Sequence, residues 1–342
     1  MQVNNLLFLI PDYIDKDHNF IEVFGFQIYY YAIAITLGML TCVLAVIPLF
    51  KRRGMKPDFL LDLMIGIIPC SIVCARLWYV LFDIKSFHSF KEVIDIRSGG
   101  LAIYGGVAGG ALGIVIVCLI HKKSITKVFD FGAVMLPLGQ AIGRWGNYFN
   151  QEVYGAVDPK AIGFPISVYI QDAGEYHYAL FFWESVANII LFALLYLFLF
   201  KYKGKRNGYA TAFYFIGYGV IRAIMEPLRD AQYNLPLFGS ETLGSEWASI
   251  LLILGGLAVL AVVYVRDFRD CGKNFKKYFA YMFAGKKEPQ KAVRNKAEHI
   301  APSEAAAKDS ENGALPVGKV RSLKVSKSDK TDAEMPENTQ KQ

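Results

Sequence analysis

Long apolar stretches fill most of this 342-residue chain and limit its fold more than any other feature. Crossing a bilayer takes about 20 apolar residues in a helix, and about seven stretches approach or exceed that length. Hydrophobic residues make up 54% of the sequence, although a polar C-terminal segment lowers the average. The sequence therefore predicts an all-α polytopic membrane protein with about seven transmembrane helices.

Polar connections separate the expected spans. The spans run from about Phe24 to Phe50, Phe59 to Phe82, Gly99 to Ile120, Val128 to Trp145, Ala179 to Phe200, Tyr209 to Met225 and Trp247 to Val265. Basic clusters follow the first, third, fifth and seventh spans, whereas the other connections carry more acidic residues. Because Lys and Arg mark cytoplasmic loops, this alternation predicts the N-terminus outside and the C-terminus in the cytoplasm.

Composition also divides the chain into three parts. Residues 1–23 are polar and lack the basic region and cleavage site of a signal peptide, so we expect an outer N-terminal segment. Residues 24–270 are expected to form the membrane domain, with outer loops or caps at about 150–178 and 227–246. Residues 286–342 lose their aromatics and become rich in Lys, Glu, Ser, Ala and Asp, which predicts a disordered cytoplasmic tail.

The charge and the cysteines exclude some classes of function. A net charge of +7 fits basic cytoplasmic loops better than nucleic-acid binding in a chain this apolar. Most of the five cysteines lie inside apolar stretches and none follows a zinc-binding spacing, so they are interpreted as small buried hydrophobes. We therefore expect no metal ion, no cofactor and no nucleic-acid partner.

One polar stretch follows directly on an apolar run, namely Gly143-Arg144-Trp145-Gly146-Asn147-Tyr148-Phe149-Asn150-Gln151-Glu152-Val153-Tyr154-Gly155. An Arg at the centre of a membrane helix costs roughly 2.5–3.5 kcal/mol, so these groups must face protein, water or a polar ligand. The planar fork of Arg144 matches phosphate oxygens, and the glycines let a lipid headgroup approach the backbone. An interfacial loop whose Arg extends to the headgroups is the simpler alternative.

Further polar residues are expected at the same outer depth. Arg222 and Glu226 share a helix face one turn apart, where an internal ion pair also holds the guanidinium towards a phosphate. Arg76 ends the second span, and Tyr31 begins the first among tyrosines that also suit an aromatic belt. The third span opens with Gly99-Gly100-Leu101-Ala102-Ile103-Tyr104-Gly105-Gly106, whose small residues also allow close helix packing in lipid.

The string Gly-Arg-x-Gly-Asn-x-x-Asn-x-Glu-x-x-Gly resembles the signature of the prolipoprotein diacylglyceryl transferase family, bacterial enzymes that begin lipoprotein maturation. Other elements of the family follow in order, namely Ala75-Arg76-Leu77-Trp78-Tyr79, Gly-Gly-x-x-x-Tyr-Gly-Gly around Tyr104, Trp183-Glu184-Ser185 in place of Tyr-Glu-Ser, and Arg-x-x-x-Glu-x-x-Arg from Arg222. The resemblance extends from about Gly25 to Val265. Many relatives have His where this chain has Tyr104. A free phenol, with a pKa of about 10, stays protonated at neutral pH, which puts a histidine-type base mechanism in doubt.

The resemblance implies a multi-pass transferase of the bacterial cytoplasmic membrane, with its active site towards the outer face. It moves an sn-1,2-diacylglyceryl group from phosphatidylglycerol to the lipobox cysteine of a preprolipoprotein and releases glycerol 1-phosphate. The substrate thiolate is the nucleophile, so no enzymatic nucleophile is required. The implied catalytic residues are Tyr31, Tyr104, Arg144, Asn147, Glu152, Arg222 and Glu226. The residues implied in binding phosphatidylglycerol are Arg144, Arg222, Arg76, Asn150 and Gly155.

Two other classes of function stay open. A lipid or solute transporter also uses intramembrane arginines and helices broken by glycine, although no internal repeat is visible. A membrane scaffold that binds anionic lipid is the third possibility. Turnover separates them, because only the transferase releases glycerol phosphate in a reaction that depends on a cysteine acceptor.

Overall fold

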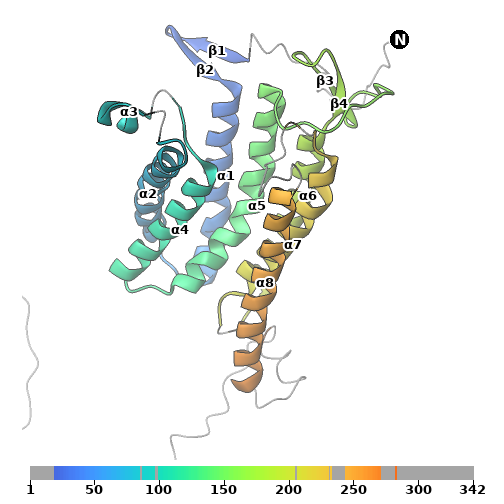
Figure 1. Cartoon of the computed structure of the whole chain (residues 1–342). Coiled ribbons are helices and arrows are strands. Elements are labelled where there is room, and N and C mark those ends of the chain that lie inside the picture. Colours follow the sequence, from blue (N-terminus) through green and yellow to red (C-terminus); the bar gives the residue numbers. More distant parts are fainter. Residues whose placement is uncertain are drawn as a thin grey trace, which may run out of the picture. The chain divides into compact units, whose positions relative to one another are not determined.

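The computed structural model describes residues 19–84, 87–96, 99–204, 206–230, 232, 243–270 and 282. Its long helices are α1 (Tyr30–Arg52), α2 (Asp58–Phe82), α4 (Ile103–Ile120), α5 (Ile125–Asn150), α6 (Leu180–Lys201), α7 (Tyr209–Met225) and α8 (Leu243–Asp270) (Figure 1). The short elements are α3 (Phe90–Ile94), the 3-10 helix η3 (Glu226–Leu228) and the strands β1 (Phe20–Val23), β2 (Phe26–Tyr29), β3 (Ser167–Ile170) and β4 (Glu175–Tyr178). The predicted helical membrane architecture is confirmed, with two small hairpins added to it.

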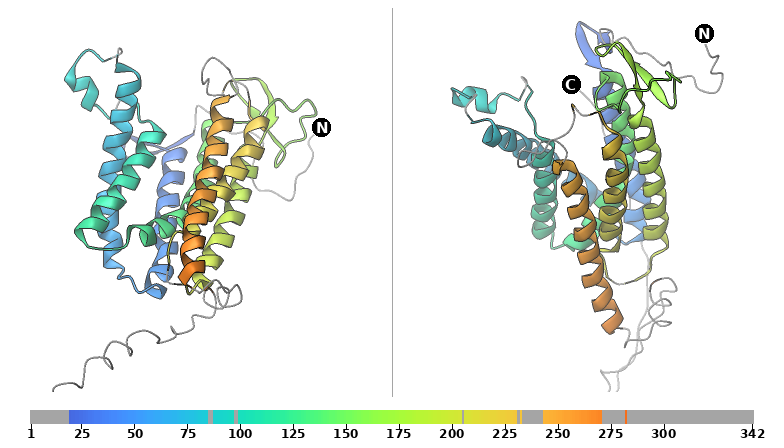
Figure 2. Two further views of the ribbon diagram at one scale, coloured as in Figure 1. Left: turned by 60° about the horizontal axis from the view of Figure 1, so that its bottom comes forward. Right: turned by 45° about the vertical axis from the view of Figure 1, so that its right-hand side comes forward.

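Among the described residues, six helices are long and apolar enough to cross a membrane, namely α1, α2, α4, α5, α6 and α8. The sixth predicted span, α7, has 17 residues, at the lower end of the roughly 17–25 that span a bilayer. It contacts α5, α6 and α8, and it lies beside α8 in both views of Figure 2. The polytopic fold therefore holds with six clear spans and one short helix packed among them.

The first span begins six residues later than predicted. Helix was expected from Phe24, but β1 and β2 form an antiparallel hairpin and α1 begins only at Tyr30. The φ angles of Phe24 (51°) and Gly25 (80°) are both positive, as in a two-residue type I′ turn. The boundary was wrong because a short apolar run is compatible with a strand as well as a helix.

Helix α4 packs closely on α2 because glycines line the contact. A Cβ atom built on Gly105, Gly109 or Gly113 would come closer than 3.0 Å to backbone atoms of α2. At Gly106, by contrast, the nearest atom to a built Cβ is the Cβ of Ala75, at an ordinary 3.8 Å. Lipid gives helices no hydrophobic reason to associate, so this close backbone approach and its van der Waals contacts hold the pair together.

A buried carboxylate joins α5 to the start of α7. Asp130 is 2% exposed and accepts hydrogen bonds from the backbone nitrogens of Gly208 (2.7 Å) and Thr211 (2.9 Å). The Thr211 hydroxyl donates a third hydrogen bond to the same carboxylate, at 2.9 Å. Because the first amides of a helix lack partners within that helix, Asp130 caps α7 from a neighbouring helix and fixes its position.

The connection between α5 and α6 folds into a small unit over the ends of these helices. Strands β3 and β4 pair antiparallel. Two isolated bridges extend this pairing, one between Val157 and His177 and one between Gly155 and Arg229. Its apolar core consists of Tyr148, Tyr154, Phe164, Val168, Ile170, Ala179 and Phe181. The unit therefore ties the end of α5 to the segment that follows α7.

Three predicted segments lie wholly or partly outside the described residues. The proposed tail at 286–342 lies entirely outside them. The N-terminal segment is described only from residue 19, and the second outer loop, at 227–246, is described at 227–230, 232 and 243–246. The predictions for the rest of these segments stay predictions.

We expect Gly109→Ala to destabilise the α2–α4 pair by about 1–3 kcal/mol, the usual cost of overpacking a close contact. Gly106→Ala is the matched control, because it adds the same methyl group to the same helix at an uncrowded position. This control should leave stability unchanged or raise it by up to roughly 0.5–1 kcal/mol, because alanine favours helix over glycine. Thermal unfolding of both purified variants in one detergent checks the prediction, and equal transition temperatures would contradict it.

Candidate active site

Charged side chains from α5, α6 and the end of α7 meet in one network. Arg144 forms an ion pair with Glu184, and Arg229 Nη2 lies 3.2 Å from the other oxygen of the same carboxylate. Arg222 forms an ion pair with Glu226, and Arg229 Nη1 lies 3.5 Å from Glu226 Oε1. Arg229 thus joins the two predicted arginine sites into one continuous cluster, which we call the arginine–glutamate network.

Burial and charge in the network favour an anionic ligand. The side chains of Glu184 and Glu226 are 2% and 4% exposed, whereas those of Arg144 and Arg222 are each 18% exposed. Burial, and next the charge of Arg222, lower the pKa of the Arg229 guanidinium. Three arginines and two glutamates leave one positive charge. One phosphate group can pair with this positive charge, because buried charges require partners. The Glu152 carboxylate, which lies beside the network, is not included in this count.

The signature stretch joins Glu152 to this network through two asparagines. Arg144 Nη1 donates to Asn147 Oδ1 at 3.3 Å, and Asn147 Nδ2 donates to Glu152 Oε1 at 3.2 Å. Asn150 Nδ2 donates to the same Glu152 oxygen at 3.4 Å. Helix α5 ends at Asn150, and Gln151 takes a left-handed conformation with φ of 49°. This turn returns Glu152 towards the helix, so that its carboxylate faces Asn147.

A small pocket opens beside the signature stretch. Asn147, Gln151 and Glu152 bring amide and carboxylate groups to it, while Tyr148, Tyr154, Val168, Tyr169, Ile170 and Phe181 form the rest of its lining. Most of these residues belong to the small unit between α5 and α6. The pocket therefore brings an apolar surface next to the carboxylate that the asparagines orient.

Two of the signature glycines, Gly146 and Gly155, leave room for other parts of the protein. A Cβ atom built on Gly146 would lie 2.5 Å from the ring of Tyr31, so Tyr31 packs directly on the signature helix. Gly143, by contrast, has no atom within 4 Å of a built Cβ. Of Gly143 and Gly146, the two signature glycines within α5, only Gly143 therefore leaves space for the approaching ligand that the sequence predicted.

Gly155 positions Arg229 through the backbone. Its nitrogen donates to Tyr178 O at 2.9 Å, and it forms an antiparallel bridge with Arg229. A Cβ atom here would lie 2.8 Å from Tyr178 Cβ and 3.0 Å from Leu228 O. Glycine is therefore required where these two chain segments cross, and the structure gives Gly155 a role in shaping the site.

Arg76 and Tyr104 make no described contact with the network. The Arg76 side chain donates to the carbonyl oxygens of Glu92 (2.6 Å), Val93 (2.9 Å), Gly99 (2.7 Å) and Gly100 (3.0 Å). Tyr104 is 57% exposed in the first turn of α4. No described contact joins either side chain to Arg144 or Arg222. Arg76 instead organises the loop between α2 and α4, and the lipid-binding and catalytic roles expected of the two residues stay predictions.

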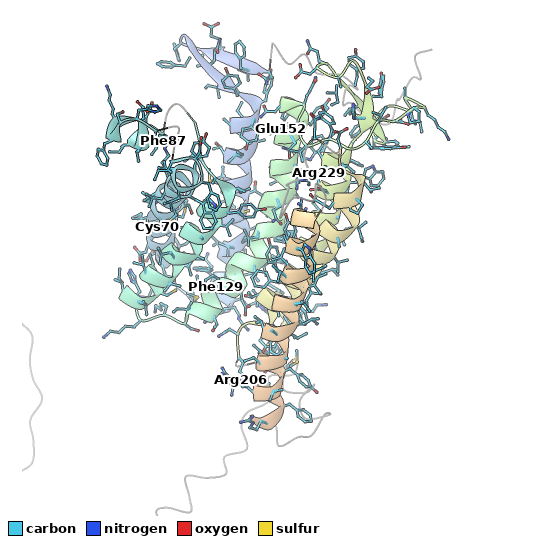
Figure 3. The ribbon with its side chains drawn as sticks, in the orientation of Figure 1. Cys70, Phe87, Phe129, Glu152, Arg206 and Arg229 are labelled. Atoms are coloured by element: carbon cyan, nitrogen blue, oxygen red, sulfur yellow. The ribbon has the colours of Figure 1, made fainter. Side chains whose placement is uncertain are left out.

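Sequence reasoning placed neither Glu184 nor Arg229 among the site residues. A carboxylate inside a span is itself a signal, since membrane helices rarely bury an unpaired charge. Arg229 closes the Arg-x-x-x-Glu-x-x-Arg element and was noted only as part of that string. Figure 3 shows Arg229 and Glu152 towards the same end of the bundle, and Arg206 towards the other end. Asking which acid neutralises the intramembrane Arg144 would have identified Glu184.

Comparison with known proteins adds independent information about this arrangement. The family model described as prolipoprotein diacylglyceryl transferase matches residues 18–262. The phosphatidylglycerol–prolipoprotein diacylglyceryl transferase of Finegoldia magna is 34% identical over 247 residues, which cover 72% of this chain and 95% of that protein. The protein of the same name from Streptococcus pneumoniae strain Hungary19A-6 is 35% identical over 252 residues, covering 71% and 92% respectively. The chain therefore belongs to the prolipoprotein diacylglyceryl transferase family.

Proposed function

We propose that this protein transfers the sn-1,2-diacylglyceryl group of phosphatidylglycerol to the lipobox cysteine of a preprolipoprotein. The observation that carries the proposal is the arginine–glutamate network, which has one excess positive charge beside a carboxylate within an apolar bundle. The phosphodiester of phosphatidylglycerol carries one negative charge and complements it. Membership in the family supports the same reaction, since its curated relatives carry the name of this transferase.

The proposed reaction exchanges one bond for another at a glyceryl carbon. The acceptor thiolate attacks the carbon that bears the phosphate, a carbon–sulfur bond forms, and the bond from that carbon to the phosphate oxygen breaks. The electron pair leaves with the phosphate, and the products are a thioether and glycerol 1-phosphate. Arg144 and Arg222 stabilise the negative charge that develops on the leaving group. The substrate supplies the nucleophile, so the protein contributes position, charge and a proton acceptor.

The acceptor thiol must lose its proton before it attacks, because the thiolate is the reactive form. Glu152 is the best-placed acceptor, since Asn147 and Asn150 orient its carboxylate at 3.2 and 3.4 Å. In this scheme Tyr31, whose ring packs on Gly146 of the signature helix, relays the proton. The positive charge of the arginines lowers the pKa of a thiol bound nearby.

We also propose that the active site faces the outside of a bacterial cytoplasmic membrane. Basic groups gather at the opposite end of the bundle, where Arg52 Nε donates to Phe200 O at 2.7 Å. Arg53 Nη1 donates to Tyr202 O at 2.9 Å in the same region. Because Lys and Arg concentrate in cytoplasmic loops, this end is assigned to the cytoplasm. The assignment leaves Arg144 and Glu152 at the outer face.

The first prediction concerns the acceptor. Purified protein in micelles that contain phosphatidylglycerol should release glycerol phosphate when it is given a lipobox peptide with cysteine at the acceptor position. The same peptide with serine should give no release, because a hydroxyl is a far weaker acid and nucleophile than a thiol. Enzymatic measurement of glycerol phosphate checks the result. Absence of release with both peptides, in folded protein, would favour transport or lipid binding instead.

The second prediction concerns the phosphate. Arg144→Ala and Arg222→Ala should each lower turnover by about 100- to 1,000-fold or more, as expected when a charge-stabilising donor is lost. Arg206→Ala is the control, because it removes an arginine that lies 3.0 Å from the buried carboxylate of Asp267 at the opposite end. The control should retain activity even if its unfolding temperature falls. Retained activity in either active-site variant would exclude the phosphate clamp.

The third prediction concerns Glu184 as a positioning residue. Glu184→Gln keeps the shape of the side chain but releases Arg144 and Arg229 from their shared carboxylate. We expect kcat to fall by roughly 10- to 100-fold, since a displaced catalytic group costs about this much. KM for the anionic lipid should not rise, because the network gains one positive charge. Glu175→Gln, on β4 at a 51% exposed side chain, is the control, and an equal loss there would contradict this role.

A further inference from the structure

The hairpin of β1 and β2 has two chemically different faces. Its register pairs Ile21 with Ile28 and Val23 with Phe26, so one face is entirely apolar. The opposite face carries the pair Glu22–Gln27 and the pair Phe20–Tyr29. The apolar side chains are nevertheless exposed in the described structure, at 44% for Ile21, 39% for Val23, 75% for Phe26 and 41% for Ile28.

The turn of this hairpin places a large aromatic side chain where the backbone favours a small one. Phe24 has a φ angle of 51° and is 97% exposed. A left-handed conformation is unfavourable for a bulky residue, and Asn or Asp before Gly is the usual choice in such turns. Neither turn stability nor contact with water accounts for a phenyl ring here. Because the Phe24 ring is almost fully exposed, an apolar partner that covers it has to come from outside the hairpin.

The hairpin leads directly into α1, which itself carries exposed apolar residues. Strand β2 ends at Tyr29 and α1 begins at Tyr30, whose nitrogen donates to Asn19 O at 2.9 Å at the base of the hairpin. Exposed apolar residues then line α1, namely Ile35, Leu37, Met39, Leu40 and Leu44. An isolated two-stranded hairpin is only marginally stable in water unless its apolar face is covered. The bilayer that surrounds α1 is the apolar phase adjoining that face.

We propose that this hairpin is a membrane anchor, which inserts Phe24 and the face formed by Ile21, Val23, Phe26 and Ile28 into the lipid interface. Glu22 and Gln27 then face the hydrated headgroups. Aromatic side chains favour this boundary, and amphipathic elements that bury an apolar face there bind membranes. The inference rests on the membrane fold and does not depend on the proposed reaction.

The anchor is directly connected to the active site. Tyr30 and Phe149 have ring centroids 5.3 Å apart, so the first turn of α1 packs on the signature helix. Tyr31, one residue further, covers Gly146. The first turn of α1 therefore links the hairpin to the signature residues.

Fluorescence quenching in the full-length protein tests the anchor. The native cysteines, at 42, 70, 74, 118 and 271, are replaced by alanine, and the chain is reconstituted in phosphatidylglycerol-containing vesicles. The variants Val23→Cys and Phe26→Cys carry an NBD label on the apolar face, and Glu22→Cys and Gln27→Cys carry it on the opposite face of the same strands. The apolar-face labels should be quenched by nitroxide-labelled lipid, and their quenching constants for aqueous iodide should be several-fold smaller. The labels on the opposite face should show the reverse.

Two results would overturn the proposal. Equal access of iodide to both faces would place the whole hairpin in water. Protection of the apolar face from both iodide and nitroxide lipid would show that protein covers it, either residues 1–18 of this chain or a second copy.

A second measurement avoids replacement of the cysteines. Phe26→Trp and Gln27→Trp are compared in otherwise unchanged protein, in vesicles with and without brominated acyl chains. The emission that Phe26→Trp adds to the native signal should be blue-shifted and quenched by the brominated lipid. The emission added by Gln27→Trp should be red-shifted and unquenched. Identical behaviour of the two variants would contradict insertion of one face.

Discussion

The buried carboxylate of Glu184 is the interaction on which the active-site end of the bundle depends. An arginine within a membrane helix is unfavourable unless a partner compensates its charge, and Glu184 is that partner for Arg144. The same carboxylate also pairs with Arg229, which lies beyond the end of α7. A buried ion pair stabilises only when its geometry is good and its remaining hydrogen-bonding groups are satisfied. The register of α5 against α6, and the path of the chain after α7, must therefore agree at this point. The packing that defines the fold at this end of the bundle therefore also positions the charged groups of the site.

The small unit between α5 and α6 supplies the second half of that constraint. Arg229 lies beyond the end of α7, where nothing in the helix itself would fix it. The bridge between Gly155 and Arg229 holds the backbone, and the hydrogen bond from the Asp230 nitrogen to Tyr154 O, at 3.1 Å, continues it. A glycine at the end of the signature thus acts on an arginine far along the chain. Substituting Gly155 would disturb the network without touching any charged group.

The pattern of apolar stretches predicted the ends of the helices well where polar residues bound them, and less well elsewhere. The sixth span, Tyr209 to Met225, coincides with α7, whereas the first was extended into a hairpin because apolar residues at Phe26 and Ile28 suit either structure. The pair Arg222–Glu226 followed from helical spacing alone. The link of Arg144 to Glu184 did not, because contacts between helices depend on packing that spacing does not encode. The four hydrogen bonds from the Arg76 side chain to backbone carbonyls did not follow from spacing either, and the lipid-binding role expected of Arg76 stays a prediction.

Charge accounting connects the arrangement to the proposed chemistry. The network and the phosphodiester are balanced before reaction, at one positive and one negative charge. As the carbon–oxygen bond breaks, the leaving phosphate gains a second negative charge, which the network alone does not neutralise. Once Glu152 has taken the thiol proton, one negative charge has disappeared 3.2 Å from Asn147, which itself contacts Arg144 at 3.3 Å. Negative charge then moves from Glu152 to the phosphate across Asn147 and Arg144, and the total charge of the site stays constant. This is the arrangement a low-dielectric site requires, because separating new charge there is costly whereas relocating existing charge is not.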